Sequence, residues 1–255
     1  MTHRILILGG TTEARQLAAR LAARTGFDVT LSLAGRTENP VPQGVPVRSG
    51  GFGGAAGLAA YLRERTIDLL VDATHPYAAR ISANAAEAAR LAGVRAIALR
   101  RPAWERAEGD RWTLVDDATE AVAALGAARR KVFLALGRQE IASFAFAPQH
   151  AYLIRSVDPV EPPLNVPEAT YILSRGPFSE EDDRALLVAH GIDAIVAKNS
   201  GGSATYGKIA AARKLGIEVI LLRRPGLPDL PSAVTVDEAM AMINHAFDPA
   251  EKRGV

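Results

Sequence analysis

A turn of small residues near the start of the chain has the composition of an anion-binding site. It follows an apolar run at 4–8 and consists of Gly9, Gly10, Thr11 and Thr12. The pattern predicts a buried strand, a tight turn and a helix that begins at Glu13. Glycines let the backbone approach a phosphate, and the first N–H groups and the dipole of a helix attract its charge. The turn and Glu13 are therefore predicted to contact a nucleotide pyrophosphate. Thr11 stands where the dinucleotide fingerprint has its second glycine, so an ordinary strand-to-helix turn is the alternative.

The end of the second predicted strand, at 28–33, indicates which dinucleotide would fit. Domains that bind NAD place an acidic residue there for the ribose hydroxyls, whereas an arginine suits the 2′-phosphate of NADP. This sequence has no acid at the strand end and offers Ser32 and Arg36 instead. A guanidinium can hold a phosphate through two hydrogen bonds. Ser32 and Arg36 are therefore candidate cofactor ligands that favour NADPH over NADH, and a solvated surface arginine is the alternative.

A second turn of small residues precedes a helix in the other half of the chain. The candidates there for binding an anionic ligand are Lys198, Asn199, Ser200, Gly201, Gly202, Thr205 and Lys208. Such a turn exposes backbone N–H groups, and the two lysines add positive charge. Because no Gly-Lys-Ser/Thr follows at the required spacing, nucleoside triphosphate hydrolysis is not predicted. Arg138, after a predicted strand at 131–136, is expected to add charge. The alternative is a glycine-rich turn with solvated lysines.

The segment that follows a third apolar strand contains the candidates for proton transfer. His75 and Tyr77 can each donate a proton, and Pro76 between them stiffens the turn. Thr74, in the same segment, is a candidate cofactor contact. A histidine that serves only as a structural hydrogen-bonding residue is the alternative. The other histidines lack the spacing of metal ligands, so no metal site is predicted.

The composition excludes several classes of function. The 255 residues are 48% hydrophobic and 23% charged, which is ordinary for a soluble globular protein. A net charge of +2 is too small and too dispersed to indicate a nucleic-acid partner. There is no cysteine, which excludes disulfides and a cysteine nucleophile. No apolar run approaches a membrane span and no signal peptide is visible, so a cytoplasmic protein is expected.

Alternating predicted strands and helices indicate an α/β fold of two Rossmann-like domains with parallel sheets and similar topology. Residues 88–102 align without gaps on 211–225 with nine identities in fifteen positions, and the tetrapeptides at 115–118 and 236–239 look like a second match. A cleft between the domains, at the carboxyl ends of the strands, is expected to hold the ligand. The expected boundaries are 1–102 for an NADPH-binding domain, 131–225 for a substrate-binding domain, 103–130 and 226–247 for connecting segments, and 248–255 for a tail.

Four motifs together resemble the precorrin-6A reductase family of cobalamin biosynthesis. They are Ile7 to Arg15, Asp72 to Ala78, Gly137-Arg138, and Lys198 to Gly202 with Thr205 and Lys208. The resemblance runs from about residue 4 to residue 247. It implies the NADPH-dependent reduction of one double bond of precorrin-6A to give precorrin-6B, with the active site between two Rossmann-like domains. It also implies a partner rich in carboxylates, which suits the cationic candidates of the second half, and it allows other corrin-pathway enzymes as partners.

The sequence leaves three alternatives open. The chain resembles the sister family that reduces the cobalt-containing substrate as closely as it does the metal-free family. A different NADPH-dependent reductase on the same duplicated scaffold would share these features. So would a two-lobed sensor that binds a nucleotide or a small anion without turnover.

Overall fold

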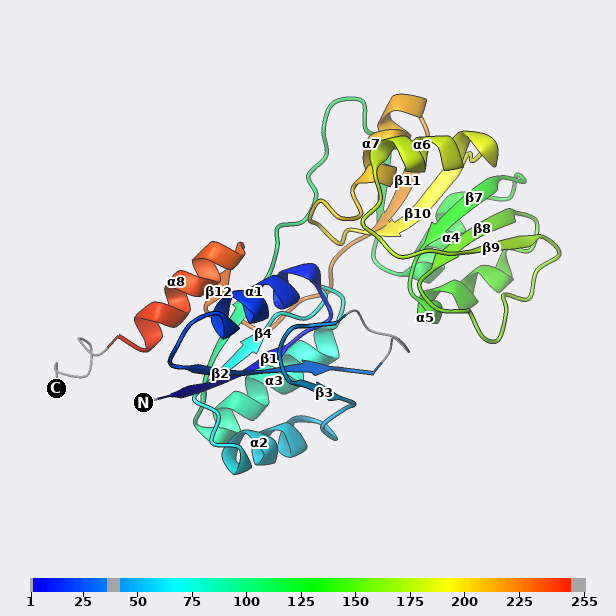
Figure 1. Cartoon of the computed structure of the whole chain (residues 1–255). Helices are drawn as coiled ribbons and strands as arrows, with labels where there is room; N and C mark the ends of the chain where they lie inside the picture. Colours follow the sequence, from blue (N-terminus) through cyan, green and yellow to red (C-terminus); the bar gives the residue numbers. More distant parts are fainter. Residues whose placement is uncertain (1, 36–41, 249–255) are drawn as a thin grey trace. The chain divides into compact units, whose positions relative to one another are not determined.

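Apolar runs of the sequence form the parallel strands of two sheets, each in a separate α/β unit (Figure 1). The computed structural model describes residues 2–35 and 42–248. The first unit comprises Met1–Arg101 and Gly226–Val255, and the second comprises Pro102–Pro225. The expectation of two parallel-sheet α/β domains is confirmed.

The first unit contains a sheet with strand order β12-β5-β4-β1-β2-β3. Its strands are β1 (His3–Leu8), β2 (Phe27–Leu33), β3 (Val47–Ser49), β4 (Leu69–Asp72), β5 (Arg95–Leu99) and β12 (Ser232–Ala233). Its helices are α1 (Thr12–Ala22), α2 (Ala55–Glu64), α3 (Ala79–Ala92) and α8 (Val236–Ala246). Alternate residues of a strand point to opposite faces, so Ile5 and Ile7 join the core with α1 and α8, whereas Leu6 and Leu8 join the core with α2 and α3.

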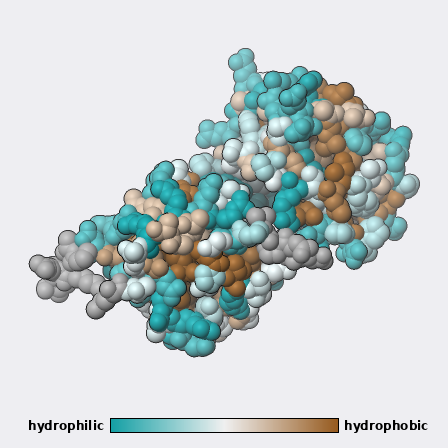
Figure 2. Space-filling view, in the orientation of Figure 1, coloured by the Kyte–Doolittle hydropathy of each residue, from teal (hydrophilic) through white to brown (hydrophobic). Residues whose placement is uncertain are grey.

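The second unit repeats this order as β6-β11-β10-β7-β8-β9. Its strands are β6 (Trp112–Val115), β7 (Lys131–Ala135), β8 (Ala151–Ser156), β9 (Ala169–Leu173), β10 (Ala194–Lys198) and β11 (Glu218–Leu222). Its helices are α4 (Ala118–Leu125), α5 (Arg138–Ile141), the short 3₁₀ helix η1 (Ala142–Phe146), α6 (Glu180–Ala189) and α7 (Gly207–Leu215). Figure 2 shows brown, hydrophobic residues among teal ones on this unit, and the exposed apolar side chains include Leu173 of the edge strand β9 and Val188 of α6.

Each sheet includes one edge strand that the chain reaches directly after a strand of the other unit. β6 comes after β5 in the chain but pairs with β11, and β12 comes after β11 but pairs with β5. The segments expected to be connectors, 103–130 and 226–247, therefore belong to the two units. A strand and a helix are expected in each of these connecting segments, but nothing in strands as short as β6 and β12 indicates which sheet they join.

The internal repeat extends into both sheets, but the match between the tetrapeptides at 115–118 and 236–239 is three residues out of register. In the sheets Leu99 pairs with Ala233 as Leu222 pairs with Val115, so Ala233 corresponds to Val115. The helices that follow then begin at equivalent caps, Asp117 for α4 and Thr235 for α8. Each cap accepts a hydrogen bond from a glutamate N–H three residues on, and that glutamate carboxylate accepts one from the N–H before the cap. This capping box, rather than the matched tetrapeptide, is the shared feature.

Arg155, Asp183 and Lys208 form a buried cluster of charged side chains in the second unit. Arg155 of β8 donates a 2.5 Å hydrogen bond to Asp183 of α6, and its guanidinium lies 3.6 Å from the ring centroid of Phe178. Lys208 of α7 is 3% exposed, and its ammonium donates to the carbonyl of Thr205 at 2.5 Å. Burial and, to a smaller extent, the like charge of Arg155 lower the pKa of Lys208 to about 7, against the opposing effect of the Asp183 carboxylate. The cluster joins β8, α6 and α7 through polar contacts inside an apolar core.

We expect Asp183→Ala to lower the free energy of unfolding by about 3–5 kcal/mol, because the buried guanidinium of Arg155 would lose its carboxylate. Denaturant titration of the full chain measures this. Glu181→Ala, an exposed position on the same helix, is the control and should cost less than about 1 kcal/mol. Equal effects of the two substitutions would contradict a structural role for the buried pair.

The pH dependence of stability tests the state of Lys208. Between pH values of about 7 and 10, the unfolded chain carries a proton on this lysine that the folded chain has released. Stability therefore rises with pH in this window, because the unfolded state binds more protons. We expect the free energy of unfolding of the wild type to rise by up to about 1 kcal/mol per pH unit more steeply than that of Lys208→Met. Parallel slopes would show that Lys208 titrates with an ordinary pKa.

Candidate functional site

The glycine turn after β1 is held in place by contacts that explain each of its small residues. A Cβ on Gly9 would lie 2.7 Å from a methyl group of Leu31, and Gly10 has a φ of +117°, which side chains rarely allow. The hydroxyl of Thr11 accepts from the N–H of Ala14 at 3.1 Å, capping α1, and donates to the carbonyl of Ala73 at 2.9 Å. Thr11 therefore ties the turn to the end of β4. The two hydrogen bonds of its hydroxyl explain why a threonine stands where the fingerprint has a glycine.

The turn borders a pocket of about 570 Å³ in the first unit. The ends of β1 and β2, the segment after β3 and the start of α3 supply its walls. Its polar and glycine positions are Gly9, Ser32, Gly50, Gly51, Gly53, Gly54, Thr74, Arg80 and Asn84. Its apolar positions are Leu8, Ala34, Phe52, Leu58 and Ile81. Apolar walls with a few polar groups at the carboxyl ends of parallel strands are typical of a nucleotide site.

The structure brings together Gly9, Ser32 and Thr74 of the predicted cofactor ligands at this pocket. Gly10 and Thr12 belong to the adjoining turn and helix start, where the first helical N–H groups lack partners within the helix. Arg36 lies outside the described residues. Phe52 and Asn84 were not predicted from the sequence. The available signal was the run of glycines at 50–54, which forms a wall of the pocket.

Asp72 fixes the direction of the Thr74 hydroxyl. Asp72 is 2% exposed at the end of β4, and its Oδ1 accepts from the Thr74 hydroxyl at 2.7 Å and from the Thr74 N–H at 3.2 Å. The hydroxyl proton is thereby directed away from the pocket, so Thr74 presents a lone pair there. It suits a ligand N–H or O–H donor.

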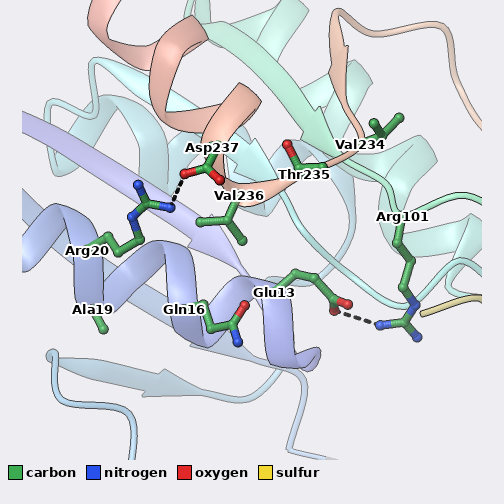
Figure 3. A pocket seen from close by; sticks show the side chains of 9 residues that line it. All are labelled: Glu13, Gln16, Ala19, Arg20, Arg101, Val234, Thr235, Val236 and Asp237. Carbon is green, nitrogen blue, oxygen red and sulfur yellow. Dashed lines mark hydrogen bonds and ion pairs between the residues drawn. The ribbon is translucent and has the colours of Figure 1, made fainter. Parts of the chain in front are cut away.

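Glu13 lies elsewhere, in a groove of about 590 Å³ between α1 and α8 (Figure 3). Its carboxylate forms a 2.7 Å ion pair with Arg101, and Arg20 forms one of 2.6 Å with Asp237 farther along the groove. The side chain of Glu13 is therefore taken up by Arg101, the last residue before the chain enters the second unit. The expected cofactor contact of Glu13 is not supported by this arrangement, and the remaining donor there is its backbone N–H.

His75 and Tyr77 lie in the turn between β4 and α3. The N–H of Tyr77 donates to Nδ1 of His75 at 3.3 Å, and the rings lie 5.7 Å apart. A neutral His75 that accepts at Nδ1 carries its proton on Nε2. Both side chains are half-buried, and neither is among the residues that line the pocket. Their role as acids stays a prediction.

The second glycine turn is braced by Trp104 and Arg224. The Asn199 side chain accepts from the Trp104 N–H at 2.7 Å and donates to its carbonyl at 2.9 Å, and the indole N–H donates to the Gly202 carbonyl at 2.8 Å. Arg224 donates to the carbonyls of Asn199 and Ser200. A Cβ on Gly201 would meet the Pro102 carbonyl at 2.0 Å. These contacts make the turn rigid, and the side chain of Asn199 holds its backbone in place.

The cationic candidates of the second unit differ in their surroundings. Arg138 is exposed at the start of α5, and Lys198 forms a 2.7 Å ion pair with Glu140 of the same helix. Lys208 is buried, and its ammonium donates to the carbonyl of Thr205 rather than facing solvent. A direct substrate contact from Lys208 does not fit this place. It supports the carbonyl of Thr205, at the end of the turn.

No helix in the described part of the chain combines the length and the apolar character needed to cross a membrane.

Comparisons with known proteins agree with the motifs. The family model for "Precorrin-6x reductase CbiJ/CobK" matches residues 4–244. A precorrin-6A reductase of Sinorhizobium sp. is 62% identical over 97% of this chain and 95% of its own length. A cobalt-precorrin-6A reductase of Priestia megaterium is 29% identical over 87% of this chain and 90% of its own. A solved structure of CobK precorrin-6A reductase superposes with a TM-score of 0.92, at 47% identity and with full coverage of both chains. The chain belongs to the precorrin-6x reductase family.

Proposed function

We propose that this chain catalyses the NADPH-dependent reduction of one double bond of precorrin-6A, giving precorrin-6B. The observation that carries the proposal is the pocket of the first unit, at the carboxyl edge of a parallel sheet, in a chain of this family. The relatives named as metal-free reductases resemble the chain more than those named as cobalt-precorrin reductases do, at 62% against 29% identity for the two compared. This favours the metal-free substrate.

The residues of the first unit fit a dinucleotide. Gly10 has a left-handed backbone and no atom within 4 Å of the place where a Cβ would stand, which leaves the turn open to a pyrophosphate beside the N-terminus of α1. The pocket wall of Leu8, Phe52 and Ile81 suits a flat aromatic ring, and Arg80 on its rim suits a phosphate. When bound, the cofactor would supply the hydride, and the protein's part is to hold its reactive ring and the substrate carbon in register.

The second unit is suited to the carboxylates of the substrate. Arg138 is exposed after β7 and the second glycine turn follows β10, and because these two strands are parallel neighbours both loops lie at the same edge of the sheet. The ion pair of Lys198 with Glu140 leaves this lysine able to exchange one carboxylate for another. In this proposal Ser200, Gly202 and Thr205 contribute backbone or hydroxyl donors. Asn199, Gly201 and Lys208 keep the turn in shape, and His75 or Tyr77 donates a proton if the reaction requires one.

Turnover with defined partners tests the proposal. We expect nicotinamide absorbance to fall when the protein is mixed with NADPH and precorrin-6A, and to stay constant when either partner is omitted. Oxidation of NADPH with another substrate but not with precorrin-6A would favour a different reductase on this scaffold. Binding of NADPH without turnover would favour a sensor, and faster turnover of cobalt-precorrin-6A would move the assignment to the sister family.

The choice between the two dinucleotides tests Arg36. We expect Arg36→Ala to raise the Michaelis constant for NADPH by roughly 10- to 100-fold, because a charge-assisted contact to the 2′-phosphate of about 1.5–3 kcal/mol is lost. The constant for NADH, which has no such phosphate, should change little. Arg36→Lys keeps the charge without the paired donors, so its Michaelis constant for NADPH should lie between those of the wild type and Arg36→Ala. Equal changes for both dinucleotides would remove Arg36 from the phosphate site.

A further inference from the structure

The wall of the pocket formed by 50–54 is a segment with little stiffness of its own. Four of its five residues are glycines, and Gly50, Gly53 and Gly54 have φ values of +104°, +79° and +93°. Glycine chains sample many conformations, and fixing each residue costs about 1–2 kcal/mol of conformational entropy. A ligand that relied on this wall would bear that cost, unless other contacts ordered the segment beforehand.

Arg48, at the end of β3, provides such contacts. Its guanidinium donates to the carbonyl of Gly50 at 2.5 Å and to that of Gly51 at 2.8 Å. The same group lies 3.7 Å from the ring centroid of Phe52 and 5.5 Å from that of Tyr61, and the two rings meet edge to face at 5.1 Å. One side chain thereby holds three consecutive residues of the wall and links them to α2. Arg48 itself is not among the residues that line the pocket.

The backbone of α2 supports the wall from the other side. A Cβ on Gly57 would lie 1.8 Å from the carbonyl oxygen of Phe52, so the wall rests directly on the helix where the side chain is missing. Phe52 thus contacts a guanidinium through its ring and a helix backbone through its carbonyl. It is the aromatic residue among those that line the pocket.

We propose that Arg48 is a positioning residue for the dinucleotide. It holds the Gly50–Gly54 wall in its binding shape and so raises the affinity for the cofactor without touching it. This inference rests on the proposed function, since it assumes that a dinucleotide occupies the pocket. A residue that acts through the wall affects NADPH and NADH alike, whereas a residue that contacts the 2′-phosphate affects them differently.

Four variants of the full chain test the proposal. We expect Arg48→Ala to raise the Michaelis constants for NADPH and NADH by the same factor of about ten, with the turnover number at saturation within about twofold of the wild type, because two charge-assisted hydrogen bonds and a cation–π contact are lost. Arg48→Lys keeps the cation but not the paired donors, so its two Michaelis constants should lie between those of the wild type and Arg48→Ala. Gly57→Ala should raise both constants although it leaves Arg48 in place. Arg63→Ala, on the outer part of α2 where the guanidinium donates to the Leu91 carbonyl, is the control and should match the wild type.

The outcomes separate the positioning role from its rivals. A larger change for NADPH than for NADH in Arg48→Ala would overturn the proposal in favour of a direct phosphate contact. Unchanged constants, or a fall in turnover number alone, would overturn it as well. If Arg48→Ala does not fold, then Arg48→Lys and Gly57→Ala, checked by thermal unfolding, decide the question in the same way.

Binding measurements keep the inference distinct from the proposed function. Titration of each variant with NADPH, followed by nicotinamide fluorescence, gives dissociation constants without any precorrin. A wild type that binds NADPH but does not reduce precorrin-6A would refute the proposed reaction, while the Arg48 variants would still be compared by affinity. A wild type that binds no dinucleotide would overturn both. Binding that is equally tight in the wild type and Arg48→Ala would overturn only the role of Arg48.

Discussion

The parallel register of β1, β2 and β4 is the constraint on which the candidate site depends. Leu8 pairs with Ser32 on one side and with Asp72 on the other. Three chain segments far apart in the sequence therefore end side by side at one edge of the sheet. The glycine turn, the end of β2 and the segment with Thr74 meet because all three strands run in the same direction. The hydrogen bond from Thr11 to Ala73 then ties two of these ends together.

Much of the fold could be predicted because short stretches of the sequence determine it. The strands that form the centre of each sheet are apolar runs, and the glycines that end α3 and α7 stand at equivalent positions of the repeat, with φ values of 68° and 66°. The membership of β6 and β12 in the sheets could not be predicted in this way. A strand of two to four residues carries no periodicity, and its partner is set by where the chain travels between the two units.

The candidate site could be predicted as a set of loops but not as a set of contacts. Position in the loops after strands identified Gly9, Ser32 and Thr74 correctly as neighbours of one pocket. Residue type alone misjudged Glu13 and Lys208, because a charge in a loop looks the same whether it faces a ligand or a partner within the protein. Arg101 forms an ion pair with Glu13, and Lys208 is buried away from the surface. The glycines at 50–54 could not be recognised as a pocket wall from the sequence, because their order comes from contacts with Arg48 and Gly57.

The exchange of final strands has a consequence for the order in which the chain is made. The second unit is one continuous stretch, Pro102–Pro225, whereas the first needs β12 and α8 from the end of the chain. On the ribosome, the second unit is therefore the first to have all its strands and helices, and the edge of β5 stays unpaired until β12 has been made. The second unit can thus complete its fold before the first unit does. A chain that stops before β12 leaves the pocket of the first unit on an incomplete sheet.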